Sequence, residues 1–179
     1  MANIQKKYIG LLGGSFDPAH KGHLGISKVA IKKLKLKKLY WVITKKNPFK
    51  NKTFYSLDVR IKYAKKFVKG QKKIETIYLD NIIKSSRIID VITYFMKKKK
   101  IKNIYFIIGS DNLVRFHKWK NWKKIVKIVK LVVFSRKGYD RKGMKSIVVK
   151  NFKNKIIFIK NKPIFISSTQ LKKRTKSNI

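Results

Sequence analysis

The sequence predicts a single doubly wound α/β domain over residues 1–179, with a mostly parallel sheet and helices on both faces. Six apolar or β-branched runs alternate with segments whose apolar residues recur at helical spacing. No internal repeat or low-complexity linker marks a second domain. The expected strands lie near residues 8–13, 39–44, 74–79, 104–109, 131–135 and 156–160. The distinctive motifs follow the ends of these strands, and this is the rim where Rossmann-like folds bind ligands.

The first strand leads into the most informative stretch of the chain, YIGLLGGSFDPAHKGHL from Tyr8 to Leu24. An apolar run breaks at Gly13-Gly14, and a helix is predicted to begin between His20 and Gly22. A strand, a glycine turn and a helix start aim backbone N–H groups and the positive end of a helix dipole at one place. This arrangement favours an anion, typically a phosphate.

Two of the three histidines, His20 and His23, stand at this helix start. At a spacing of three residues both rings can lie on one helix face, above the expected phosphate. The alternative is a pair of exposed histidines beside an ordinary turn. The glycine pair and the Phe16-Asp17-Pro18 segment favour the functional interpretation.

The later helices show capping signals. Ser56 is a plausible N-cap, with Asp58 in the first turn, and Gly70 ends that helix. Ser85 or Ser86 is expected to cap a helix that runs through Met96. The lysine run 97–100 then fits a helix C-terminus, where cations are favourable.

Composition restricts the class of protein. The chain has 179 residues, of which 44% are hydrophobic, which suits one domain with a real core. It contains no cysteine, no long apolar span and no recognisable signal peptide, so we expect a cytoplasmic enzyme without disulfides or thiolate metal sites. The seven acidic residues form no local cluster, and a protein-built metal cage is therefore not predicted.

The net charge is +41, from 48 Lys and Arg against 7 Asp and Glu. Nucleic-acid binding is one interpretation. The lysines are spread through nearly every segment, however, and their abundance together with Ile and Asn suggests codon bias in an AT-rich genome. In either case the field attracts anionic substrates and favours non-specific polyanion binding at low salt.

Several segments together carry a family resemblance. GGSFDPAHKGH resembles the signature of the H-x-G-H nucleotidyltransferase superfamily, and ISSTQLK at residues 166–172 resembles its C-terminal motif. FIIGSDNL at 106–113, NPFK at 47–50 and RKGY at 136–139 are similar to segments of the nicotinate-nucleotide adenylyltransferases. The SSRIIDV segment at 85–91 corresponds in place to the part of that family that meets the nicotinate ring, and matches it mainly at Ser86 and Asp90.

The resemblance implies transfer of AMP from ATP to nicotinate mononucleotide, giving deamido-NAD and pyrophosphate by direct in-line attack on the α-phosphorus. Magnesium would arrive with ATP, and no protein-bound metal is implied. His20 and His23 would be catalytic. The implied ATP-binding residues are Gly13, Gly14, Ser15, Phe16, His20, His23, Gly109, Asp111, Ile166, Ser167, Ser168 and Lys172. The implied mononucleotide-binding residues are Lys50, Ser86, Ile88, Trp119 and Arg136.

Plainer interpretations stand beside these roles. Asp111 and the Ser167-Ser168 pair also suit helix caps, Trp119 and Trp122 suit core anchors, and Arg136 suits a solvated strand end. Trp122 is assigned to packing.

The chain also departs from the family at several places, among them Arg87 and Ile88 in the 85–91 segment, for which the resemblance gives a location and not individual roles. Phe49 stands where the family has histidine, Lys137 where it has proline, and Lys172 where it has arginine, for which Arg174 is a possible substitute. The alternatives are a pantetheine-phosphate adenylyltransferase, or a basic nucleic-acid-binding module on the same scaffold. The choice between nicotinate and nicotinamide mononucleotide, and the oligomeric state, stay open.

Overall fold

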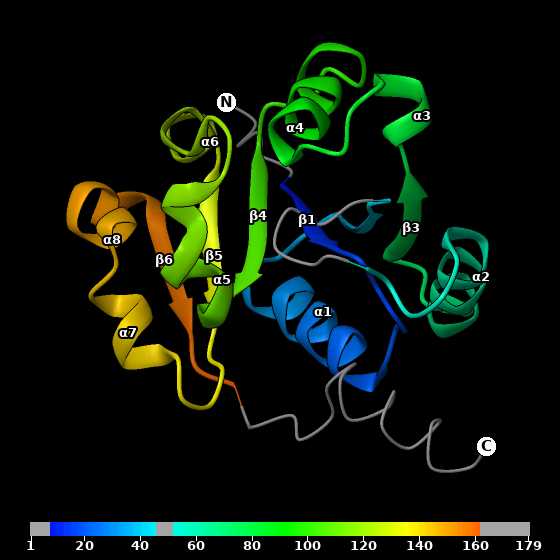
Figure 1. The fold of residues 1–179 in the computed structure, drawn as a ribbon, viewed down its shortest axis with the longest axis horizontal. Helices are drawn as coiled ribbons and strands as arrows, with labels where there is room; N and C mark the ends of the chain where they lie inside the picture. Colours follow the sequence, from blue (N-terminus) through cyan, green and yellow to red (C-terminus); the bar gives the residue numbers. More distant parts are fainter. Residues whose placement is uncertain (1–7, 46–51, 162–179) are drawn as a thin grey trace, which may run out of the picture.

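The structure is a computed structural model that describes residues 8–45 and 52–161. Six strands form one sheet in the order β3-β2-β1-β4-β5-β6 (Figure 1). They are β1 Ile9–Gly14, β2 Lys38–Ile43, β3 Ile74–Tyr78, β4 Ile104–Gly109, β5 Lys130–Phe134 and β6 Ile156–Ile159. Each lies within one residue of its predicted bounds. Every neighbouring pair is parallel, so the doubly wound α/β prediction is confirmed.

Helices connect the strands and cover both faces of the sheet. They are α1 Lys21–Lys33, α2 Leu57–Val68, α3 Asp80–Ile83, α4 Ile88–Lys97, α5 Ser110–Arg115, α6 Trp122–Ile128, α7 Asp140–Met144 and α8 Ile147–Phe152. Two 3-10 turns, η1 Phe116–Lys118 and η2 Lys153–Lys155, complete the described elements. The sequence did not predict α7 and α8, which are short and lie between β5 and β6.

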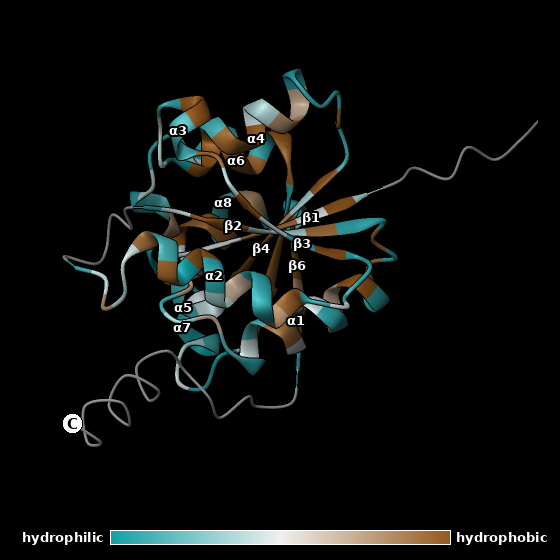
Figure 2. Cartoon of the chain, turned by 90° about the vertical axis from the view of Figure 1, so that its right-hand side faces the viewer, coloured by the Kyte–Doolittle hydropathy of each residue, from teal (hydrophilic) through white to brown (hydrophobic). Residues whose placement is uncertain are grey.

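The sheet separates two hydrophobic cores. Successive strand residues point to opposite faces, so Leu11 enters one core and its neighbour Leu12 enters the other. Helices α4, α6 and α8 contribute to the first core, and α1 and α2 cover the opposite face with Ala30 and Ala64. Figure 2 shows α4 and α6 on one side of the strands and α1 and α2 on the other. Strands buried on both faces explain the near-continuous apolar runs in the sequence.

Capping follows the predictions at α2 and differs at α4. The Ser56 hydroxyl accepts the Val59 N–H at 3.4 Å, and Gly70 takes the left-handed φ of +79° that ends the segment. At α4 the N-cap is Arg87, so the prediction that Ser85 or Ser86 caps this helix is wrong. The Ser86 hydroxyl, one residue before this N-cap, instead donates to the carboxylate of Asp80 on α3.

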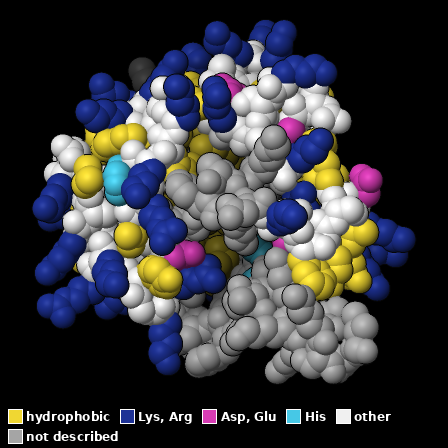
Figure 3. All heavy atoms as spheres, in the orientation of Figure 1, with side chains coloured by type: hydrophobic (Ala, Val, Ile, Leu, Met, Phe, Trp, Pro, Cys, Tyr) yellow, Lys and Arg dark blue, Asp and Glu magenta, His cyan; other side chains and the backbone are white. Residues whose placement is uncertain are grey.

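Basic side chains are numerous on the face of the molecule that Figure 3 shows. Figure 3 shows Lys and Arg side chains distributed across the visible face instead of gathered over one element. None of the helices in the described part of the chain combines the length and the apolar character that a membrane crossing requires.

Candidate active site

All the strands run in the same direction, so their carboxyl ends meet along one rim of the sheet. The end of β1 carries the glycine turn, and the end of β2 carries Thr44. The end of β4 carries Gly109 to Asp111, and Arg136 follows β5. The topology therefore brings motifs from distant parts of the sequence to a common edge.

The two histidines are built into the first turn of α1. His20 is the N-cap, and its Nδ1 accepts the N–H of Gly22 at 3.0 Å. The Nδ1 of His23 accepts the N–H of His20 at 3.3 Å, which closes a reciprocal capping box. Because Nδ1 is an acceptor in both rings, the neutral tautomer of each carries its proton on Nε2. The helix start thus presents two imidazole N–H donors whose ring centroids lie 3.9 Å apart.

His20 is held in its neutral form. Burial of the ring and, as a smaller cause, the positive charge of Arg136 together lower the pKa of His20 from its ordinary 6.5 to about 4. At neutral pH the ring is a hydrogen-bond donor without a charge of its own. This suits a group that must stabilise negative charge without binding the anion too tightly before reaction.

Aromatic packing fixes the orientation of His23. Its ring lies 4.7 Å from the Phe16 ring and 5.8 Å from Trp41, measured between centroids. The Trp41 indole N–H donates to the Ser27 hydroxyl, which in turn donates to the backbone carbonyl of His23. The resemblance assigns Phe16 to the ATP site, and the structure places its ring, which is buried, between His23 and Trp41. Its side chain therefore supports the histidine.

A buried acid and a buried base hold the glycine turn in place. The Asp17 carboxylate, 1% exposed, accepts the backbone N–H groups of Phe54 and Tyr55 at 2.8 and 2.9 Å. Arg60, 2% exposed, donates from Nη1 to the carbonyls of Ser15 and Thr44 at 2.7 and 2.8 Å. Burial lowers the pKa of Arg60, and the Asp17 carboxylate opposes this effect.

Sequence reasoning missed Arg60, which it assigned to an ordinary helix. The available signal was its position four residues before Ala64, on the apolar stripe of α2. A long charged side chain on a buried stripe requires buried partners.

A second cluster forms where β4 and β5 end. The guanidinium Nη1 of Arg136 lies 3.0 Å from Oδ2 of Asp111. Oδ1 of Asp111 is buried and has no hydrogen-bond partner within the described residues. Gly109 makes this arrangement possible, because a Cβ at that position would overlap Oδ1 of Asp111. The electrostatic effect of Arg136 on His20 shows that this cluster adjoins the histidine pair.

Asp140, the first residue of α7, holds the second cluster in place through hydrogen bonds. Its Oδ1 accepts the Ser110 hydroxyl at 2.6 Å and the Arg136 backbone N–H at 2.9 Å. Burial raises the pKa of Asp140, but hydrogen bonds from Ser110, Arg136 and Ser135 and the charge of Lys160 outweigh that effect and lower it overall. The ionised carboxylate therefore holds the backbone of Arg136 against α5.

Two of the residues predicted for the mononucleotide, Ile88 and Trp119, pack against the same hydrophobic core near the glycine turn. A Cβ on Gly13 would lie 3.5 Å from the Phe106 ring and 3.8 Å from Cδ1 of Ile88. Phe106 also contacts Trp119, at 5.9 Å between centroids, and the half-buried Trp119 packs on Phe116 at 5.0 Å. Ile88 and Trp119, both partly exposed, thus pack against the core around the buried Phe106, near Gly13.

The other residues singled out in the sequence either have partners outside the histidine pair and the Asp111–Arg136 cluster, or lie outside the described part of the chain. Trp122 packs edge-to-face on Phe152 at 5.7 Å, in the packing role expected for it. Asp90 accepts the Ser85 hydroxyl at 2.6 Å, as a local polar partner. Lys50, Ile166, Ser167, Ser168, Lys172 and Arg174 lie outside the described residues. Within the described ranges, no three His, Cys, Asp or Glu side chains gather as a metal-binding group.

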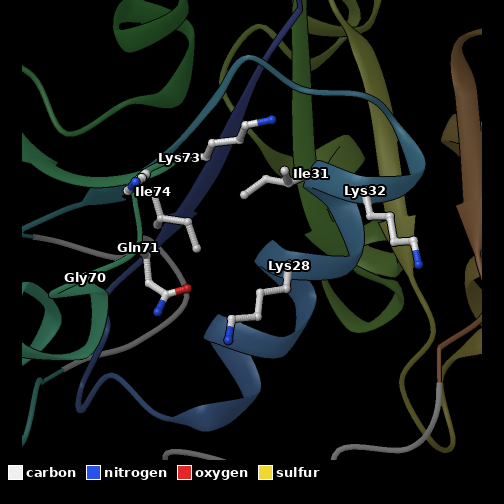
Figure 4. Close-up of a pocket in the computed structure, with 8 residues that line it drawn as sticks. Lys28, Ile31, Lys32, Gly70, Gln71, Lys73 and Ile74 are labelled. Carbon is white, nitrogen blue, oxygen red and sulfur yellow. The ribbon is translucent and has the colours of Figure 1, made fainter.

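Two surface hollows lie away from this rim. One, of about 270 Å³, is lined by residues of α1 and of the segment before β3, among them Lys28, Lys32, Lys72 and Lys73. Figure 4 shows that the labelled lysines do not converge, since Lys32 extends away from Lys73. The other, of about 680 Å³, shares Ile74 with it. Both lie by the first residues of β3, whereas the motifs lie where the strands end.

Comparison with known proteins agrees with this geometry. The cytidylyltransferase-like family model matches residues 11–174. A protein of Pelagibacter ubique named probable nicotinate-nucleotide adenylyltransferase is 49% identical over 172 residues, covering 96% of this chain and 95% of the relative. A protein of Clostridium novyi with the same name is 33% identical over 175 residues, covering 94% and 86%.

A solved structure shares the fold. Plasmodium falciparum nicotinic acid mononucleotide adenylyltransferase, complexed with NaAD, superimposes with a TM-score of 0.73 at 18% identity, covering 93% of this chain and 83% of that one. The strand order, the histidine-capped helix and these sequence relatives lead to one assignment. The chain belongs to the cytidylyltransferase-like family and, within it, to the nicotinate-nucleotide adenylyltransferases.

Proposed function

We propose that this chain transfers the adenylyl group of ATP to nicotinate mononucleotide, giving deamido-NAD and pyrophosphate, as a step of NAD biosynthesis. The observation that carries the proposal is the pair of imidazole rings, His20 and His23, that caps α1 through Nδ1 beside the glycine turn. The names of the sequence relatives support the choice of substrates. We also propose that the enzyme acts as a single domain in the cytoplasm.

The chemistry requires no protein nucleophile, because the acceptor phosphate already carries an anionic oxygen. That oxygen attacks the α-phosphorus of ATP and forms the new P–O bond, while the bond to the β-phosphate bridging oxygen breaks. Pyrophosphate leaves with the electron pair, so negative charge grows on the leaving group. Nε2–H of His20 and His23 would donate to those oxygens, and catalysis would be positioning and charge stabilisation.

The remaining rim residues divide between the two substrates in this proposal. Gly13 to Ser15, Gly109 and Asp111 would hold ATP, with Oδ1 of Asp111 as an acceptor for a ribose hydroxyl. Ile88 and Trp119 would form the apolar wall for the pyridine ring, and Arg136 would bind the mononucleotide phosphate. Arg136 must then exchange its contact with Asp111 for the substrate.

Magnesium fits this rim as a companion of ATP. Mg²⁺ is commonly held by substrate phosphates with few protein ligands, and the described residues form no group of three metal-binding side chains. When bound, it would neutralise triphosphate charge. His20 and His23 would then act on the same polyphosphate from the protein side.

The decisive experiment supplies purified protein and Mg-ATP with nicotinate mononucleotide, nicotinamide mononucleotide or phosphopantetheine, and follows pyrophosphate release. We expect the highest kcat/KM with nicotinate mononucleotide, and deamido-NAD as the product by mass. Preferential turnover of phosphopantetheine would overturn the proposal. Tight, sequence-selective nucleic-acid binding at physiological salt, without turnover of any acceptor, would overturn it as well.

A further inference from the structure

One buried carboxylate at the rim has no role in the chemistry described so far. Asp80, the first residue of α3, is 8% exposed. A buried carboxylate is costly unless several donors satisfy it. A single oxygen of Asp80, Oδ2, accepts from three groups that lie on two separate segments.

The first segment is the end of β2. The backbone N–H of Lys45 donates to Oδ2 of Asp80 at 2.9 Å, and the Thr44 hydroxyl donates to it at 3.3 Å. Thr44 also donates its backbone N–H to the carbonyl of Gly14 at 3.2 Å, and its own carbonyl accepts from Arg60. The carboxylate is thus connected, through one residue, to the glycine turn.

The second segment leads into α4. The Ser86 hydroxyl donates to Oδ2 of Asp80, and the backbone N–H of Ser85 donates to the Asp80 carbonyl at 3.2 Å. Two residues later, Cδ1 of Ile88 lies beside Gly13, 3.8 Å from the position that a Cβ would take there. Fixing Ser86 therefore fixes the start of α4 and the position of Ile88.

We propose that Asp80 is a positioning residue for the acceptor half of the active site. Its carboxylate joins the 85–88 segment to the end of β2, and so sets the distance between Ile88, the Lys45 backbone and the glycine turn. The inference rests on the proposed function, because it assigns Ser86 and Ile88 to the mononucleotide. It adds a residue that touches neither substrate and acts through those that do.

The test uses the full chain and separates the two substrates. Asp80→Asn keeps the shape and weakens the three hydrogen bonds, because an amide lacks the negative charge. We expect the KM for nicotinate mononucleotide to rise by at least about 10-fold, as for the loss of a charge-assisted hydrogen bond, with a KM for ATP within about 3-fold of the parent. The preference for nicotinate over nicotinamide mononucleotide should fall in the same variant.

Two further variants complete the design. Thr44→Val removes one donor at nearly constant shape and should shift the same KM in the same direction by a smaller factor, which keeps the test valid if Asp80→Asn does not fold. Asp58→Asn makes the same chemical change at an exposed carboxylate in the first turn of α2 and should leave both KM values unchanged. Thermal unfolding of each variant accompanies the kinetics.

The outcomes are distinct. An unchanged KM for the mononucleotide in both Asp80→Asn and Thr44→Val, or an equal rise for both substrates, would overturn the positioning role. A lower Tm with the ratio of the two KM values preserved would do so too, because it would show a general structural role. Absence of turnover by the parent enzyme would instead defeat the proposed function, and the inference with it.

Discussion

His20 and His23 each use Nδ1 to accept a backbone N–H of the same helical turn, at 3.0 and 3.3 Å. The main chain thereby selects the tautomer of both rings and fixes their planes before any substrate binds. Donors that are already oriented require no reorganisation as charge develops, which is the condition under which they accelerate a reaction most.

Removal of either ring should affect kcat. We expect His20→Ala or His23→Ala to lower kcat by at least about 10²-fold, as for the loss of one preorganised donor. Steady-state pyrophosphate release measures this directly. His117→Ala, which changes the third histidine outside α1, is the matched control and should retain turnover. Near-parental kcat in either α1 variant would remove that histidine from the chemistry.

The pKa of His20 predicts a specific pH dependence. The folded protein binds a proton at His20 only near pH 4, whereas the unfolded chain binds one near the ordinary value of 6.5. The unfolded state therefore holds more protons between these values, so stability falls as pH drops from about 6.5 to about 4 and is unaffected by this group above that range.

The same pKa responds to Arg136. Arg136→Gln removes the second cause of the lowered value and leaves burial, so the pKa of His20 should rise part of the way toward 6.5. NMR titration of the imidazole ring protons measures the pKa of His20 in the parent and in Arg136→Gln. Urea unfolding at several pH values between about 4 and about 7 measures the predicted loss of stability. An unchanged His20 titration in Arg136→Gln would show that the two side chains do not interact.

Two glycines should separate activity from stability. Gly109→Ala meets the Asp111 carboxylate at a backbone φ of −85° that any residue adopts, so we expect it to displace Asp111 and raise the KM for ATP by about 10-fold with little change in Tm. Gly70→Ala faces open space at a φ of +79°, and should cost about 1 kcal/mol of stability without a kinetic effect. Kinetics and urea unfolding of both variants test the pair. The reverse pattern would contradict the roles assigned to these positions.

Arg60 should matter most for stability. Arg60→Met leaves the carbonyls of Ser15 and Thr44 without their donor and the buried Asp17 without its nearby cation, which should cost about 3 kcal/mol. Urea denaturation measures the change in the free energy of unfolding. Arg115→Gln, at an exposed arginine of α5, should change it by less than about 0.5 kcal/mol. An equal change in the free energy of unfolding for the two substitutions would show that the buried contacts of Arg60 do not stabilise the fold.

Strand positions were predictable because hydrophobic periodicity is a local property. The runs ending at Gly14 and Gly109 are apolar on both faces, and that pattern identifies buried parallel strands without knowledge of their neighbours. The H-x-x-H spacing was equally local, since one helical turn determines how the two rings face each other. The cap of α4 was predicted wrongly because the competing partner of Ser86 lies on α3.

The sequence by itself therefore determined the alternation of strands and helices, the rim at which the motifs meet, and the histidine pair. Only the tertiary structure decided that Arg136 pairs with Asp111 and lowers the pKa of His20, and that Asp80 joins two segments of the rim. The physical reason is that periodicity records which face of an element is buried. The charge state and partners of a buried polar group depend on side chains that folding brings from other strands.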